Sequence, residues 1–162
     1  MLKLYPFKKN FDKIFNAEKK KISEVIGNFK IHHIGSTAVK GLGGKGIIDI
    51  MIVLDNWRQA PSLIKKLKSI GFTHIHEKEK GRIFLNPKAK TSFADSHLHV
   101  VIFGSKPHRQ LLAFRNRLRH NKKTANQYWQ LKRQLAGESR NNRLKYTKDK
   151  GDYIKRILAG RT

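Results

Sequence analysis

The chain lacks cysteine and is poor in acidic residues. Only 11 Asp and Glu stand against 36 Lys and Arg in 162 residues, which gives a formal net charge of +25. The absence of cysteine excludes disulfides and thiolate metal sites. The shortage of acid favours a polyanionic partner, such as RNA, DNA, anionic lipid or a nucleotide. The alternative is a lysine-rich solvated surface with no such role, because the basic residues are spread along the chain.

Long apolar segments are also missing. No apolar run approaches the roughly 20 residues of a membrane-spanning helix, and the N-terminus has no signal-peptide core. We therefore expect a cytoplasmic protein that does not use a membrane. The length and a hydrophobic content of 38% suit one domain over residues 1–162. The sequence leaves the oligomeric state open.

Residues 31–54 form the stretch around which the chain is organised. Two apolar runs, Ile31–Ile34 and Ile47–Leu54, have the length and composition of buried strands, and a glycine-rich connection joins them. Gly35, Ser36 and Thr37 follow the first strand, and a short helix through Leu42 is expected after them. A helix N-terminus reached over a glycine suits an anion. Asp49 is the one charge in the second run, so a metal ion or a substrate is expected to pair with it.

Periodicity predicts the remaining elements. Strands are expected over Phe72–Ile75, Arg82–Leu85 and His97–Phe103. Helices are expected over Asn10–Ile26 and from Asp55 to Gly71, and three more helices are expected in the last third of the chain. Ser105, Asn121 and Thr147 are the expected caps of those three C-terminal helices. His97 and His99 lie two residues apart, so their side chains project from the same face of a strand.

Several motifs together resemble one family, the GrpB family of the nucleotidyltransferase superfamily. The matching segments extend from about Tyr5 to Ala159. They include H-I-G-S-T-A-V, G-L, Lys45 and I-I-D-I in the central stretch, H-L-H-V at 97–100, L-L-A-F-R-N-R-L-R at 111–119, Y-W-Q-L-K at 128–132 and Y-T-K-D-K at 146–150. The resemblance implies an α/β fold with a mixed sheet flanked by helices and a helical C-terminal third.

The resemblance also implies a chemistry. A nucleoside triphosphate would lie on the Gly35–Thr37 turn, with Ser36 and Lys45 at its phosphates, and attack at the α-phosphate would release pyrophosphate. Asp49 would hold Mg²⁺ or Mn²⁺, and His97 and His99 would ligate the metal or activate an acceptor hydroxyl. Arg82 and Arg115 stand at family-like positions from which they could reach the same cleft.

The sequence departs from the superfamily where a second strand carboxylate is expected, because that residue is Met51. One carboxylate with two imidazoles suits Mn²⁺, Fe²⁺ or Zn²⁺ better than Mg²⁺. The glycines at 43, 44 and 46 predict a loose loop before Asp49. Two alternatives to a nucleotidyltransferase therefore stay open: a non-catalytic nucleotide- or RNA-binding module, and a metal-dependent phosphohydrolase. The acceptor is not indicated.

Overall fold

The computed structural model describes residues 4–6, 10–79, 81–87, 96–138 and 143–160. Five strands form one sheet in the order β1-β2-β5-β4-β3. Their bounds are β1 (Lys30–Ile34), β2 (Ile48–Leu54), β3 (His74–Glu79), β4 (Arg82–Asn86) and β5 (Ser96–Ile102). β2 and β5 run parallel, and the other neighbouring pairs are antiparallel. The predicted mixed sheet is confirmed.

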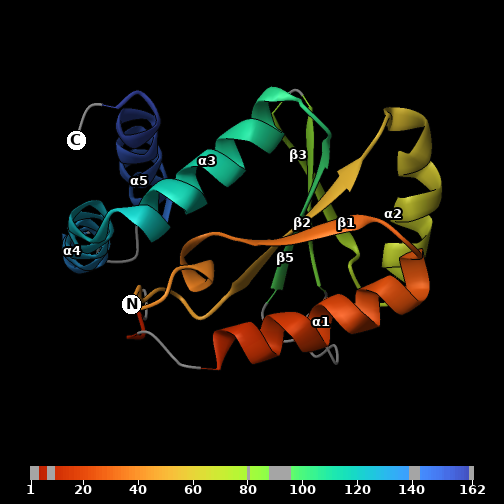
Figure 1. Ribbon diagram of the computed structural model, residues 1–162, viewed down its shortest axis with the longest axis horizontal. Helices are drawn as coiled ribbons and strands as arrows, with labels where there is room; N and C mark the ends of the chain where they lie inside the picture. Colours follow the sequence, from red (N-terminus) through yellow and green to blue (C-terminus); the bar gives the residue numbers. More distant parts are fainter. Residues whose placement is uncertain (1–3, 7–9, 80, 88–95, 139–142, 161–162) are drawn as a thin grey trace.

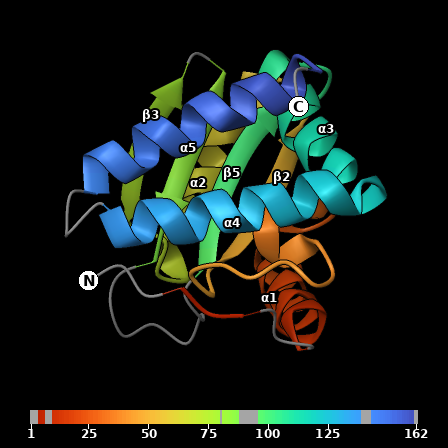
Figure 2. The ribbon, with the colours of Figure 1, turned by 90° about the vertical axis from the view of Figure 1, so that its left-hand side faces the viewer.

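The α-helices flank this sheet (Figure 1). They are α1 (Phe11–Ile26), α2 (Ala60–Ser69), α3 (Lys106–His120), α4 (Lys122–Glu138) and α5 (Arg143–Leu158). α1 and α2 bury their apolar faces against one side of the sheet, and α3 crosses the other side through Leu111 and Leu112. Figure 1 shows α4 and α5 beside the end of the sheet at which β2 begins, and Figure 2 shows them lying next to each other there.

The apolar sequence of β2 follows from its central place in the sheet. Both of its faces are covered, so Ile50 and Ile52 pack toward α1 and α2 while Met51 and Val53 pack toward α3. A third apolar cluster joins the loop after β1 to the C-terminal helices, through Val39, Leu42, Phe114, Tyr128 and Ile157. This cluster holds α4 and α5 close to the beginning of β2.

Several boundaries differ from the sequence-based expectation, among them that of α2, which begins at Ala60 and not at Asp55. Ser36–Ala38 form a single 3₁₀ turn, not a helix that continues to Leu42. β3 begins at His74 and continues to Glu79, whereas the predicted strand covers Phe72–Ile75. Thr147 lies inside α5, which begins at Arg143, so the prediction that Thr147 caps this helix is wrong.

The other two caps are confirmed. The Ser105 side chain accepts a hydrogen bond from the His108 amide, and the Asn121 side chain accepts one from the Thr124 amide. Among the described residues, no helix is both long enough and apolar enough to cross a bilayer.

Candidate functional site

The pairing of β2 with β5 brings three of the predicted residues together. Asp49 lies opposite His97 in the parallel register, and His99 lies opposite Met51. Asp49 Oδ1 is 3.4 Å from His97 Nδ1 and 3.4 Å from His99 Nε2. The expectation that Asp49 and both histidines converge is therefore confirmed. The Asp49 side chain is 27% exposed and that of His97 is 24% exposed, so this end of the cluster is open to solvent.

One carboxylate oxygen serves both histidines, and this sets the protonation of the cluster. Burial alone would raise the pKa of Asp49, but the hydrogen bonds from His97 and His99 outweigh it and hold this pKa below its ordinary value. Burial lowers the pKa of His99, against the opposing effect of Asp49. Phe84 fixes both imidazoles from the side, with ring centroids 4.9 Å from His97 and 5.0 Å from His99.

These donor atoms do not fit a preformed metal centre. The imidazole nitrogens that face Asp49 both lie at hydrogen-bonding distance from the same carboxylate oxygen. Met51, at the position of the second carboxylate, is fully buried against Ile34, Val53 and Val101. Within the described ranges, no group of three acidic or histidine side chains is arranged to hold a metal ion. Asp95, which precedes the two histidines in the sequence, lies outside those ranges.

Gly35 brings the turn after β1 into direct contact with Asp49. Its φ is 71°, in the left-handed region that favours glycine. A Cβ on Gly35 would lie 3.0 Å from both Cβ and Cγ of Asp49, closer than such atoms normally approach. The turn and the carboxylate thus form one surface, and only glycine allows this approach.

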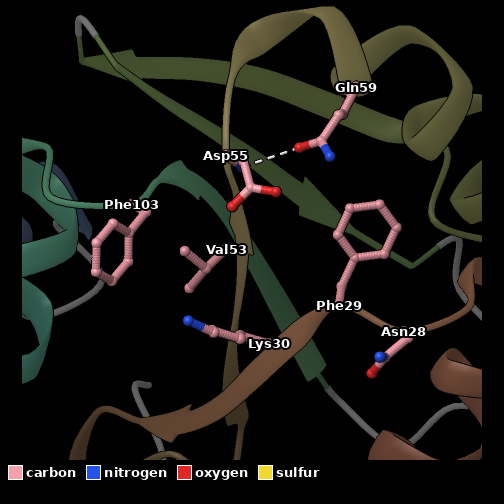
Figure 3. A pocket seen from close by; sticks show the side chains of 7 residues that line it. All are labelled: Asn28, Phe29, Lys30, Val53, Asp55, Gln59 and Phe103. Carbon is pink, nitrogen blue, oxygen red and sulfur yellow. Dashed lines mark hydrogen bonds between the residues drawn. The ribbon is translucent and has the colours of Figure 1, made fainter.

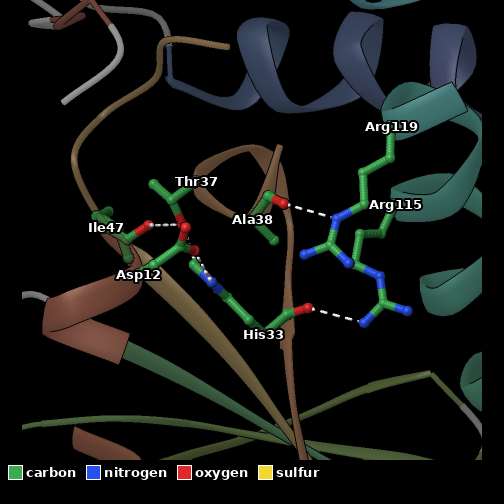
Figure 4. A network of polar contacts seen from close by, with 7 residues as sticks. All are labelled: Asp12, His33, Thr37, Ala38, Ile47, Arg115 and Arg119. Carbon is green, nitrogen blue, oxygen red and sulfur yellow. Dashed lines mark hydrogen bonds and ion pairs between the residues drawn. The ribbon is translucent and has the colours of Figure 1, made fainter. Parts of the chain in front are cut away.

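The two hydroxyl residues of the turn have different surroundings. Thr37 is buried, and its hydroxyl is 3.0 Å from His33 Nε2 and 3.4 Å from the carbonyl oxygen of Ile47 (Figure 4). It therefore supports the turn from inside. The Ser36 hydroxyl lies 2.8 Å from the point where a Cβ on Gly44 would stand. Of the two hydroxyls, Ser36 is the one that faces the glycine loop.

The glycine loop is pinned in place, contrary to the prediction that its glycines make it loose. Tyr5 and Gly44 exchange two backbone hydrogen bonds, of 2.7 and 2.9 Å. A Cβ on Gly43 would lie 2.6 Å from the Trp129 ring. These glycines permit close packing, and the loop is held between the N-terminal segment and α4.

Two lysines lie at this loop, Lys132 and Lys45. Lys132 of α4 is buried, and its ammonium group donates to the carbonyl oxygen of Gly43 and lies over the Tyr128 ring at 4.8 Å. The same Nζ is 3.6 Å from the point where a Cβ on Gly44 would stand, close to Ser36. Lys45 of the loop lies over the Tyr146 ring at 4.6 Å.

The pKa values show that these charges affect one another and Asp49. Burial, together with the positive charges of Lys150 and Lys45, lowers the pKa of Lys132 from 10.5 to about 7, while Asp49 acts in the opposite direction. Burial lowers the pKa of Lys150 in α5, and Asp49 again opposes the shift. Among the described residues, neither Lys132 nor Lys150 forms an ion pair. Lys132 and Lys150 thus interact electrostatically with a carboxylate that already bonds two imidazoles.

The sequence-based prediction of the site did not include Lys132 or Lys150, although helical periodicity indicates that both positions are unusual for lysine. Along α4, Ala125, Tyr128, Lys132 and Leu135 share the buried face. Lys150 lies four residues after the buried Tyr146 on α5. A lysine at an otherwise apolar position of an amphipathic helix is costly to bury, and its presence there indicates a role for its charge.

Of the two predicted arginines, Arg115 bonds outside this centre and Arg82 lies near it. The Arg115 guanidinium donates to the His33 carbonyl oxygen at 3.0 Å and to the Asn116 side chain, so it fastens α3 to β1 (Figure 4). Arg82 lies opposite Val101 on β5, two residues beyond the position opposite His99. Its charge contributes to the lowered pKa of His99, which places it near the cluster.

A separate pocket lies toward the opposite end of β2. It is lined by Asn28, Phe29, Lys30, Val53, Asp55, Gln59 and Phe103 (Figure 3). The Asp55 amide donates to Gln59 Oε1 at 2.8 Å, and the Lys30 ammonium lies 5.0 Å from the centre of the Phe103 ring. None of the sequence-predicted site residues lines it.

Comparison with known proteins gives consistent relatives. A family profile described as GrpB protein matches residues 1–160. The UPF0157 protein BH1888 of Halalkalibacterium halodurans is 31% identical over 160 residues, which cover 96% of this chain and 80% of that protein. The crystal structure of conserved protein GrpB from Enterococcus faecalis has a TM-score of 0.79 and 28% identity, and the match covers 96% of this chain and 99% of that one.

A more distant likeness is to a crystal structure of the Cid1 poly(U) polymerase with MgGTP bound. The TM-score is 0.55 at 14% identity, and the match covers 78% of this chain but only 42% of that enzyme. A cytoplasmic RNA terminal U-transferase gives the same TM-score at 14% identity. At this level of identity the likeness concerns the fold alone, which is nucleotidyltransferase-like.

Proposed function

Since this chain belongs to the GrpB family and has a nucleotidyltransferase-like fold, we propose that it binds a nucleoside triphosphate and transfers the nucleotidyl group to an acceptor hydroxyl. The observation that carries this proposal is the group of Lys45, Lys132 and Lys150 beside Ser36 and Asp49. The ammonium group of Lys132 is buried, Lys150 is half-buried, and among the described residues neither of these two forms an ion pair. Such groups are costly to bury, and a polyphosphate is an anion of matching charge. We assign the β- and γ-phosphates to this group.

The proposed reaction is an in-line displacement at the α-phosphorus. The acceptor oxygen bonds to this phosphorus, the bond to the bridging oxygen breaks, and pyrophosphate leaves. The lysines stabilise the charge that develops on the leaving group. A carboxylate only accepts hydrogen bonds, so His97 donates to Asp49 through Nδ1, and its Nε2 is the acceptor of the hydroxyl proton. Asp49 orients the imidazole, and no step is assigned to a metal.

The fully buried Met51 favours a second candidate, a nucleotide-binding module without turnover. A polyanion such as RNA remains a proposed partner in either case, because the net charge is +25. A metal-dependent phosphohydrolase is not proposed, since the donor set does not fit the metal that it needs.

The test is release of labelled pyrophosphate from γ-labelled NTPs, supplied with a mixture of RNA oligonucleotides and small hydroxyl acceptors. We expect turnover by the natural chain and a loss of roughly 10²-fold or more in His97→Gln. The control variant Lys68→Met removes a charge at an exposed position on α2 and should leave turnover unchanged. Nucleotide binding without pyrophosphate release would support the non-catalytic candidate instead.

A further inference from the structure

The site differs from a metal-dependent polymerase site in the sign of the charges around Asp49. The second carboxylate position is Met51, which is held in an apolar cluster beneath α3. The other groups that bond Asp49 are imidazoles, and the groups beyond it are ammonium ions. A divalent cation here would find one shared carboxylate and would be repelled by the lysines.

We propose that the site binds the nucleotide polyphosphate as the metal-free anion, with Lys45, Lys132 and Lys150 in place of the divalent cation. This inference rests on the proposed function and names the form in which its substrate binds. The Cid1 structure contains MgGTP, so the proposal is a specific difference between this chain and a protein of the same fold.

The arrangement of the lysines supports direct contact with phosphate oxygens. The Lys132 ammonium and the Ser36 hydroxyl lie beside the same glycine, 3.6 and 2.8 Å from the position that a Cβ on Gly44 would take. Both groups can donate hydrogen bonds, so a phosphate at this edge of the loop would meet two neighbouring donors. Lys132 is held over Tyr128 and Trp129, at 4.8 and 5.3 Å, so its position is set before the ligand arrives.

The surroundings of Lys132 also explain how it is kept ready for an anion. Without ligand, neighbouring positive charges and burial disfavour its protonated form. A bound polyphosphate would favour that form, so binding should be accompanied by proton uptake near neutral pH.

The experiment is isothermal titration of the chain with ATP in excess EDTA and again in excess Mg²⁺. We expect binding in EDTA at least as tight as in Mg²⁺. Lys132→Met and Lys45→Met should each weaken binding in EDTA by roughly ten- to a hundredfold, the range for a lost charge-assisted hydrogen bond. Lys68→Met is the matched control, and circular dichroism confirms that each variant is folded.

The variant Asp49→Asn distinguishes metal-free nucleotide binding from binding through a metal ion held by Asp49. If no metal is held, removing this negative charge should tighten ATP binding in EDTA; if Asp49 holds a metal, the variant should lose binding that requires Mg²⁺. Binding that occurs only with Mg²⁺ would overturn this inference and leave the proposed function intact. Absence of nucleotide binding in both buffers would overturn both. Unchanged affinity of Lys132→Met in EDTA would overturn the assignment of the lysines.

Discussion

Replacing Gly35 with alanine should lower the free energy of unfolding, and the loss can be estimated from two costs. The residue has a φ of 71°, and left-handed backbone costs a residue with a Cβ about 1–2 kcal/mol. The new methyl would also lie 3.0 Å from Cβ and Cγ of Asp49, and overlap of this kind costs about 1–3 kcal/mol. Together these terms predict a loss of about 2–5 kcal/mol in the free energy of unfolding.

Gly41→Ala is the matched control. This glycine has a φ of 84°, but its Cβ would meet no atom within 4 Å, so only the backbone cost applies. Urea unfolding measures both variants, and each kcal/mol shifts the Tm of a chain of this size by about 2–4 °C. Gly35→Ala should also weaken nucleotide binding, because Asp49 must move, whereas Gly41→Ala should not. Equal destabilisation by the two substitutions would refute the close approach of Gly35 to Asp49.

Three further predictions concern charge and burial. Burial lowers the pKa of His33 from 6.5 to about 4, so between these pH values His33 stays neutral in the folded chain but is protonated in the unfolded chain. The free energy of unfolding should therefore fall by up to about 3 kcal/mol as the pH drops from about 6.5 to about 4. The variant His33→Phe keeps the stacking on Phe15 and should flatten this slope in acid unfolding. The pKa of Lys132 is likewise lower in the folded chain than in the unfolded chain, so the free energy of unfolding should rise as the pH increases from about 7 to about 10.5. Lys132→Met should remove this rise in thermal melts. A rise that persists in the variant would show that another group causes it. Met51→Asp should cost roughly 3 kcal/mol or more, against less than about 1.5 for Met51→Leu, since it buries a carboxylate in an apolar cluster; equal unfolding midpoints would mean that this position tolerates a second metal ligand.

The sheet and the Asp49 cluster were predictable from local patterns. Alternating histidines on one strand and a lone carboxylate in another require only a parallel pairing to meet, and the β2–β5 register supplies it. Gly35 could be placed at a turn because it directly follows the apolar run of the first strand. These features depend on spacing within short segments.

Helical periodicity marks Lys132 and Lys150 as unusual, but their place in the site and the roles of Arg115 and Thr37 could not be predicted in this way. Lys132 and Lys150 come to the site because α4 and α5 pack on the loop after β1, a contact between segments about 90 residues apart or more. Arg115 looks like a phosphate ligand in sequence, yet the α3–β1 contact gives it a backbone carbonyl instead. Glycines at 43 and 44 suggested flexibility, but close packing by Tyr5 and Trp129 decides their conformation.

The most direct test of the central claim is a crystal structure with a non-hydrolysable NTP analogue, grown with EDTA. We expect the terminal phosphates within hydrogen-bonding distance, about 3 Å, of Lys132 Nζ and the Ser36 hydroxyl, with the α-phosphate facing Asp49 and His97. A nucleotide bound instead in the pocket between Phe29 and Phe103 (Figure 3), or phosphates that contact none of the three lysines, would contradict it.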